Sequence, residues 1–139
     1  MIISTVKLYD FDEFIGEIKK KGLHETILLP FQNGVYSEQK ITQEFGEEKT
    51  FGAVAQISSF INENQYVIHK GKLASFFVGN MSDIVNKKLL KFCEISKNSG
   101  LDIQYKSNIK EKIWEKFIFL SAYSGITTLT KKSIGEIFE

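Results

Sequence analysis

Two apolar segments near the start of the chain decide the fold. The first is Ile2-Ile3-Ser4-Thr5-Val6-Lys7, and the second is Thr26-Ile27-Leu28-Leu29-Pro30, which continues into Phe31-Gln32-Asn33-Gly34. Each is rich in apolar and β-branched residues, which predicts buried strands over residues 2–6 and 26–29. Pro30 stops the second strand, and Gln32-Asn33-Gly34 marks a tight turn or loop.

The residues between these strands have the pattern of an amphipathic helix. Asp10 and Glu13 have the spacing of a capping box, and Gly22 suits the position just after a helix. Residues 19–21 are all lysine, which the helix dipole favours at this end. The apolar side chains that share one face are Phe11, Phe14, Ile15 and Ile18. Strand, helix and strand in this order predict an α/β fold with a parallel sheet.

The middle of the chain predicts antiparallel strands. Residues 51–61, 66–69 and 73–78 are rich in β-branched, aromatic and small residues, and Asn62-Glu63-Asn64 is the expected turn after the first of them. Lys70-Gly71-Lys72 is expected to break the later strand. The charged residues 44–49 are interpreted as a solvated loop.

The last third is predicted to be mainly helical. Ser82 is the expected cap of a helix that runs to Gly100, and residues 101–105 form a short strand candidate. Asn108 and Glu111 have capping-box spacing before an apolar helix that Ser124-Gly125 ends or bends. Ser133 is a candidate start for one more helix.

Bulk composition excludes several classes of protein. The chain has 139 residues, 42% of them hydrophobic, which is enough for a real core and argues against disorder. A formal net charge of +1 argues against nucleic-acid binding by bulk electrostatics. The single cysteine forms no internal disulfide or cysteine-based zinc site. With no apolar run of roughly 18 residues and no secretory signal pattern, no membrane contact and a cytoplasmic location are expected.

Three polar residues are candidates for chemistry. Asn33 follows a predicted parallel strand, where open α/β sheets bind ligands, but Asn-Gly also simply supports turns. Lys116 lies in a mostly apolar helix, where desolvation would make it a useful general acid; the alternative is a solvated lysine near Lys112 and Glu115. Lys7 ends the first strand and is either a phosphate or ribose contact or a surface lysine.

The two histidines, His24 and His69, are interpreted as structural. They lie far apart in the sequence, and no metal triad or Ser-His-Asp arrangement accompanies them. No metal site is predicted.

Four segments in order resemble the ketopantoate reductase (2-dehydropantoate 2-reductase) family. They are residues 2–10, the Gln32-Asn33-Gly34 region at 28–35, residues 57–79 with the hairpin, and the helix start at 108–117 continuing to 124–130. The resemblance implies a partial Rossmann-like nucleotide-binding domain with an antiparallel hairpin over residues 1–106. Residues 107–139 would begin an all-α domain for substrate binding and dimerisation.

The resemblance also implies an activity and roles for residues. The reaction would be NADPH-dependent reduction of ketopantoate to pantoate, on the route to pantothenate and coenzyme A. Lys116 would be the catalytic general acid, Lys7 and Asn33 would contact NADPH, and Asn33 and Ser124 would contact substrate. Many family members carry asparagines where this chain has Leu120 and Ser124, so the substrate is expected to be ketopantoate or a related 2-keto acid.

One family feature is absent from the 139 residues, the Gly-rich GxGxxG turn that holds the pyrophosphate. The chain alone is therefore expected to bind NADPH weakly or not at all and to be inactive. Three interpretations stay open: a partial record of a full-length reductase, a split-enzyme subunit, or a non-catalytic remnant. Besides the keto acid, the expected partner is a second copy or a complementing chain, because the first strand and Phe138 expose apolar surface.

Overall fold

The start of the chain forms the predicted parallel unit. In the computed structural model, which describes residues 1–138, strand β1 (Ile2–Ser4) pairs in parallel with β2 (Leu28–Pro30). They are joined by the 3₁₀ turn η1 (Leu8–Asp10) and helix α1 (Phe11–Lys20). The helix forms because its apolar residues recur on one face, and Phe11, Ile15 and Ile18 are buried as expected.

A second sheet follows, built on a long hairpin. Strand β3 (Phe51–Ile61) pairs antiparallel with β4 (Val67–Asn80), which in turn pairs in parallel with β5 (Ile103–Tyr105). Three helices complete this part of the described chain: α3 (Lys87–Asn98), α4 (Ile109–Thr130) and α5 (Ile134–Phe138). None of the helices within residues 1–138 is long and apolar enough to cross a bilayer.

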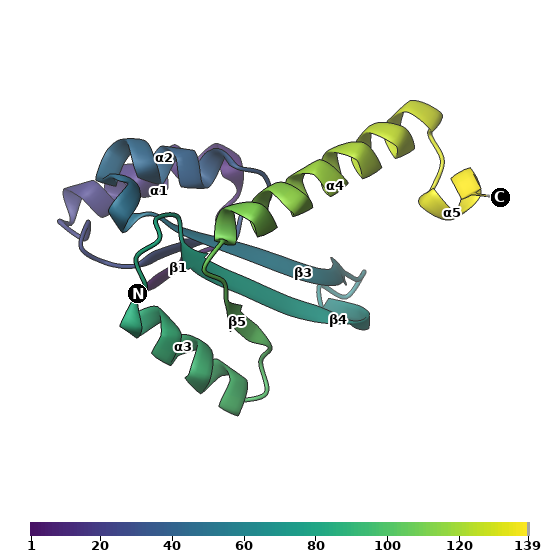
Figure 1. The fold of residues 1–139 in the computed structure, drawn as a ribbon. Coiled ribbons are helices and arrows are strands. Elements are labelled where there is room, and N and C mark those ends of the chain that lie inside the picture. Colours follow the sequence, from purple (N-terminus) through teal and green to yellow (C-terminus); the bar gives the residue numbers. More distant parts are fainter. Residues whose placement is uncertain (139) are drawn as a thin grey trace.

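Helices cover both faces of the strands. Figure 1 shows α1 and the additional helix α2 (Tyr36–Phe45) on one side and α3 on the other, while α4 projects beyond the hairpin. Adjacent leucines of β2 point to opposite faces: Leu28 packs with α1, and Leu29 packs in the core beneath α3. A strand with both faces covered explains why residues 26–29 are apolar without alternation.

Two paired glycines allow the first turns of α4 to pack closely against the hairpin. Gly52 of β3 lies opposite Gly79 of β4, and the buried Ile109 and Ile113 of α4 lie over them. A Cβ on Gly52 would lie 2.6 Å from Ile113 Cδ1, and a Cβ on Gly79 would lie 2.1 Å from the Lys106 carbonyl oxygen. The missing side chains therefore allow α4 and the segment before it to approach the strands closely.

Several predicted boundaries were wrong. Helix α3 begins at Lys87, because Asn86 and not Ser82 accepts hydrogen bonds from the amides of Lys88 (3.0 Å) and Leu89 (3.2 Å). Strand β4 stays extended through Lys70-Gly71-Lys72, but its pairing with β3 is interrupted there, because Ser59 pairs with His69 and Ile57 with Ala74, and residues 70–73 have no partner in β3. Ser124-Gly125 does not end α4, which continues to Thr130.

Capping at the two predicted boxes had different outcomes. Asp10 precedes α1, but its side chain makes no capping hydrogen bond. Asn108 does cap α4, because its Oδ1 accepts from the Glu111 amide at 3.4 Å.

Helix α2 was missing from the sequence prediction. Residues 36–43 were left unassigned, and the predicted loop at 44–49 contains the end of α2 and the 3₁₀ turn η2 (Glu47–Lys49). The helix was hard to recognise because its buried face includes Ser37 and Glu38 as well as Ile41. It is tied to α1 by Tyr36 Oη, which donates to Asp12 Oδ1 at 2.8 Å.

Glu38 is an unusual member of this core. Its residue is only 3% exposed, and no salt bridge to it forms among the described residues. Burial raises the pKa of its carboxyl to about 7, and hydrogen bonds from the backbone at Glu38 and Ala53 oppose the rise. Glu38 therefore changes charge near neutral pH.

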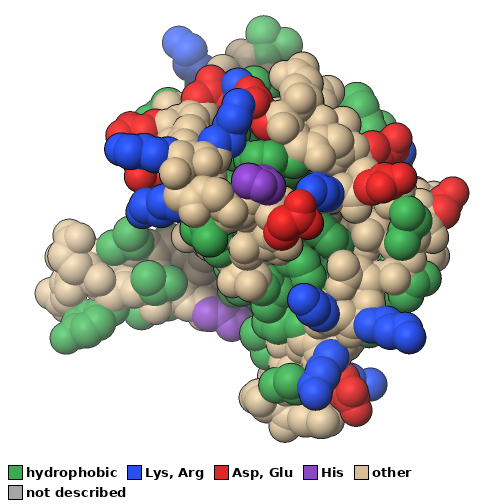
Figure 2. All heavy atoms as spheres, turned by 90° about the vertical axis from the view of Figure 1, so that its left-hand side faces the viewer, with side chains coloured by type: hydrophobic (Ala, Val, Ile, Leu, Met, Phe, Trp, Pro, Cys, Tyr) green, Lys and Arg blue, Asp and Glu red, His purple; other side chains and the backbone are tan. Residues whose placement is uncertain are grey.

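The charged residues are mixed in sign. On the face shown in Figure 2, lysines and acidic side chains alternate over the helices, and a band of hydrophobic side chains lies between the charged groups. This mixing is expected from nearly equal numbers of basic and acidic residues, 18 and 17.

The paired glycines give a graded stability prediction. Gly79→Ala should lower the free energy of unfolding by roughly 1–3 kcal/mol, because its Cβ meets backbone that moves only with the β5–α4 connection. Gly52→Ala should cost less, since the tip of the Ile113 side chain can shift. Urea unfolding of both variants checks this order, and an equal or larger loss for Gly52→Ala would contradict it.

Glu38 gives a pH-dependent stability prediction. Its pKa rises from an ordinary 4.5 to about 7, so the folded state holds the proton more tightly than the unfolded state. Stability should therefore fall as pH rises from 4.5 to 7, by at most about 3 kcal/mol from this group. Glu38→Gln should remove this part of the pH dependence in urea unfolding, whereas the exposed Glu48→Gln should not. Identical pH profiles for Glu38→Gln and the unaltered chain would contradict the account.

Candidate functional site

Two of the sequence-predicted site residues, Asn33 and Lys116, line one cavity. Its volume is about 390 Å³, and it lies between the β2–α2 loop, the hairpin and α4. The residues that line it are Asn33, Ala55, Gln56, Ile57, Leu73, Glu115, Lys116, Phe119 and Leu120. One wall is thus apolar, while the amide and the ammonium group supply polar contacts, the usual composition of a small-molecule site.

Lys116 is held in place by the hairpin. Its Nζ donates a hydrogen bond to the Ala55 carbonyl oxygen at 2.7 Å, and the side chain is partly buried. Burial lowers the pKa of this amine below its ordinary value, because a low-dielectric surrounding disfavours the charged form. The alternative, a solvated lysine near Lys112 and Glu115, is not found, since Lys116 is partly buried and Glu115 accepts from Lys112, at 2.6 Å.

Asn33 is positioned by its neighbours in the loop. Gln32 Nε2 donates to Ser4 Oγ at 2.8 Å and to the Val6 carbonyl at 3.0 Å, which fixes the loop after β2 to the end of β1. Gly34 has a φ of +98°, so the Asn-Gly pair also makes the turn that was the alternative explanation. The exposed side chain of Asn33 is left beside the cavity.

Lys7 and Ser124 are not part of this cavity. Lys7 is exposed in the segment between β1 and η1, at the same edge of the sheet as the Asn33 loop. Ser124 is exposed two turns beyond Lys116 on α4, past Leu120, which does line the cavity. The structure therefore brings together two of the four predicted site residues.

The histidines lie elsewhere. His69 Nε2 hydrogen-bonds to the Leu73 carbonyl at 2.9 Å on the exposed part of β4. His24 lies beside a separate hollow lined by Lys19, Glu44, Phe45 and Lys49. Within residues 1–138, no group of three or more His, Cys, Asp and Glu side chains is placed to share a metal ion.

The fit to a nicotinamide dinucleotide is partial. The ends of β1 and β2 present Lys7 and Asn33 at one edge, and the buried Gln32 Oε1 there has no hydrogen-bond partner. These groups suit the nicotinamide and ribose part of such a molecule. The described glycines with positive φ are scattered, at 22, 34, 46, 71 and 100, and form no strand-to-helix cradle for a pyrophosphate.

Sequence reasoning missed two residues that shape the site. Gln32 fixes the loop, and its position between a predicted strand and Asn33 was the available signal. Ala55 supplies a backbone carbonyl, which carries no side-chain signature and could not be recognised from sequence.

Solved structures share the fold. A 2-dehydropantoate 2-reductase from Geobacter metallireducens superimposes with a TM-score of 0.76 at 22% identity, over 94% of this chain and 43% of the other. D-Mandelate dehydrogenase in complex with NADH gives 0.81 at 20% identity, over 99% and 45%. These likenesses confirm the predicted α/β, partly Rossmann-like architecture.

Curated sequences give the same result. An uncharacterized oxidoreductase of Bacillus subtilis, YkpB, is 23% identical over 137 residues, and a 2-dehydropantoate 2-reductase of Archaeoglobus fulgidus is 23% identical over 133. The chain spans about half the length of these relatives, 45% and 44% respectively. The family model described as "Ketopantoate reductase PanE/ApbA" matches residues 1–83, more than half of the chain. The chain belongs to the ketopantoate reductase PanE/ApbA family.

Proposed function

We propose that this chain carries the general-acid side of an NADPH-dependent reduction of ketopantoate, or a related 2-keto acid, to the 2-hydroxy acid, in cytoplasmic pantothenate and coenzyme A synthesis. The observation that supports this most is that Lys116 and Asn33, remote in sequence, line one cavity. The names of the relatives support the reaction class, since two are 2-dehydropantoate 2-reductases and one structure is a D-mandelate dehydrogenase.

Lys116 is proposed to protonate the substrate oxygen. NADPH, when bound, supplies the hydride. As negative charge develops on the keto oxygen, Lys116 Nζ–H donates to it, transfers its proton and regains one from water. The Ala55 carbonyl, 2.7 Å from Nζ, orients the amine, and the lowered pKa makes the ammonium a stronger acid.

The remaining candidates are assigned to binding. Asn33 is proposed to contact both cofactor and substrate, Lys7 the cofactor, and Ser124 the substrate once further helices enclose α4. The apolar wall of the cavity, with Ile57, Leu73 and Leu120, fits a branched hydrocarbon chain on the keto acid. We retain the division at residues 106 and 107, because β5 ends at Tyr105 and α4, which begins at Ile109, projects beyond the hairpin in its later turns (Figure 1).

A second candidate function is a split-enzyme subunit or non-catalytic remnant that acts by association. Among the described residues β1 pairs only with β2, so its other edge is free. Beside it lies an almost wholly apolar cavity of about 460 Å³. Its lining residues are Ile3, Thr5, Phe31, Ala55, Phe76, Phe92, Leu101 and Ile103. A complementing chain or a second copy would bury both features.

An NMR titration tests the catalytic proposal. With the chain ¹⁵N-labelled, millimolar ketopantoate should shift the Asn33 side-chain amide and the backbone amides of Ala55 and Leu120, because these groups surround Lys116. Lys116→Met should weaken the response at least several-fold by removing the cation. Lys110→Met, on the same helix but outside the cavity and paired with Glu47, should leave it unchanged.

Isothermal titration with NADPH separates the two candidates. Weak NADPH binding together with the mapped ketopantoate response supports a catalytic half that needs a Gly-rich unit. Micromolar NADPH binding would contradict the claim that this unit is essential. A folded sample with no ketopantoate response around Lys116 would contradict the catalytic proposal and favour the association function.

A further inference from the structure

A separate cavity lies between α2 and α4, and the proposed reaction does not use it. Its volume is about 290 Å³, and most of its lining is apolar. One side of it is formed by Lys110, Ile113 and Trp114 of α4. None of the residues that line it also lines the Lys116 cavity. The other lining residues are Val35, Glu38, Gln39, Thr42, Gln43 and Met81.

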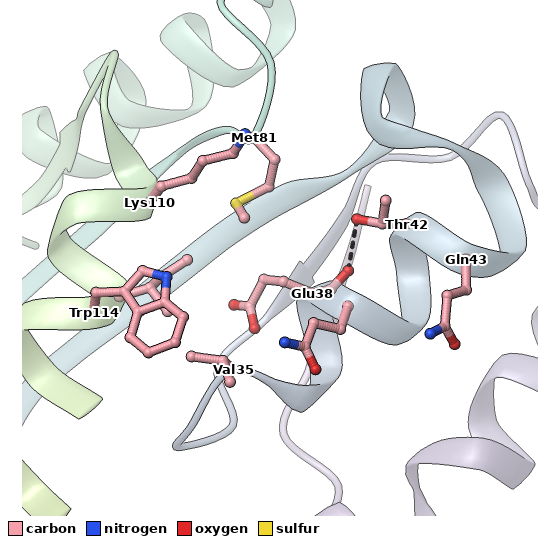
Figure 3. Close-up of a pocket in the computed structure, with 9 residues that line it drawn as sticks. Val35, Glu38, Thr42, Gln43, Met81, Lys110 and Trp114 are labelled. Atoms are coloured by element: carbon pink, nitrogen blue, oxygen red, sulfur yellow. Dashed lines mark hydrogen bonds between the residues drawn. The ribbon is translucent and has the colours of Figure 1, made fainter. Parts of the chain in front are cut away.

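The polar centre of this cavity is the Glu38 carboxyl. Figure 3 shows it pointing from α2 into the space in front of Trp114, while Thr42 Oγ1 donates to the Glu38 backbone carbonyl at 2.9 Å. The residue is 97% buried, being 3% exposed, so the carboxyl is built into the site and is not a surface charge. The carboxyl also accepts hydrogen bonds from the backbone at Glu38 and Ala53.

Within residues 1–138, no Lys or His side chain forms an ion pair with Glu38. Lys110 is the only other charged residue that lines the cavity, and its Nζ lies 2.6 Å from Glu47 Oε1. On α2 the nearby Lys40 pairs with Asp12 and Glu44, at 3.6 and 3.4 Å. A buried carboxylate without a cation is costly, so a ligand that brings positive charge is the occupant that stabilises it most.

The walls define the rest of the ligand. Trp114 presents an indole ring that attracts cations, and Val35, Met81 and Ile113 supply an apolar surface. A small metal ion would find only one carboxylate, with too few oxygen ligands for a hard cation. An ammonium group attached to a short hydrocarbon would pair with the carboxylate, and its hydrocarbon would pack against the apolar walls.

We propose that the cavity between α2 and α4 is a binding site for a small organic ammonium ion, with Glu38 as the anionic contact and Trp114 as the aromatic wall. This site is independent of the keto acid cavity. Its occupation links α2 to α4.

The single tryptophan of the chain makes the site directly observable, because Trp114 lines this cavity and supplies all of the indole fluorescence. n-Butylammonium chloride, added at pH 8, should give a saturable change. With a Glu38 pKa of about 7, the ionised fraction falls from about nine-tenths at pH 8 to about three-hundredths at pH 5.5, so affinity should fall roughly thirty-fold. The neutral analogue n-butanol should bind at least ten-fold more weakly than the ammonium at pH 8.

Two variants sharpen the test. Glu38→Gln should lose the response at pH 8, whereas Glu48→Gln, the same change at an exposed position, should keep it. If Glu38→Gln does not fold, the ratio of n-butylammonium affinities at pH 8 and pH 5.5 in the unaltered chain tests the proposal. No saturable change at pH 8, equal affinity at pH 5.5 and 8, or equal binding of n-butanol would each overturn the proposal.

Discussion

The close contact between α4 and the paired glycines of the hairpin is the constraint on which the rest of the molecule depends. Gly52 and Gly79 leave no side chain between the strands and the helix, so Ile109 and Ile113 lie directly against backbone. Because a helix is rigid, this contact fixes everything that α4 presents in its next turns. Trp114 and Lys116 are positioned by the packing of Ile109 and Ile113, which lie within the two turns before them.

Two cavities flank this helix, and the same physical cause perturbs an ionisable group in each. Burial lowers the pKa of Lys116 and raises that of Glu38, in both cases by disfavouring the charged form. Lys116 has a carbonyl acceptor at 2.7 Å, which suits a proton donor, whereas Glu38 has no cationic partner in the described structure. Such groups concentrate where proteins bind ligands or do chemistry.

The parallel unit could be predicted from sequence because its apolar runs are short, dense and bounded by turn residues. Helix α2 could not, because Ser37 and Glu38 are buried against the usual preference of polar side chains for solvent. The break predicted at Lys70-Gly71-Lys72 corresponds to a shift of register between β3 and β4, where Gly71 has a φ of +81°.

The candidate site was predictable only in part. Lys116 and Asn33 were singled out by family resemblance and by their local setting, but nothing in their spacing places them in one cavity. The two residues meet because α4 packs closely on Gly52 and Gly79 of the hairpin. In the sequence these are two isolated glycines with no recognisable motif around them. Ser124 and Lys7, which the family resemblance also singled out, lie outside the cavity.

The titration of the Lys116 amine tests most directly whether α4 holds this side chain in the cavity. The measurement is an NMR pH titration of the chain with labelled lysine side chains, with the Lys116 signal assigned by its loss in Lys116→Met. The account predicts a midpoint below the ordinary value of 10.5, because α4 holds the amine partly buried against the Ala55 carbonyl. A midpoint at or above 10.5 would show that Lys116 is solvated or paired with an acid, and that α4 does not place it in the site.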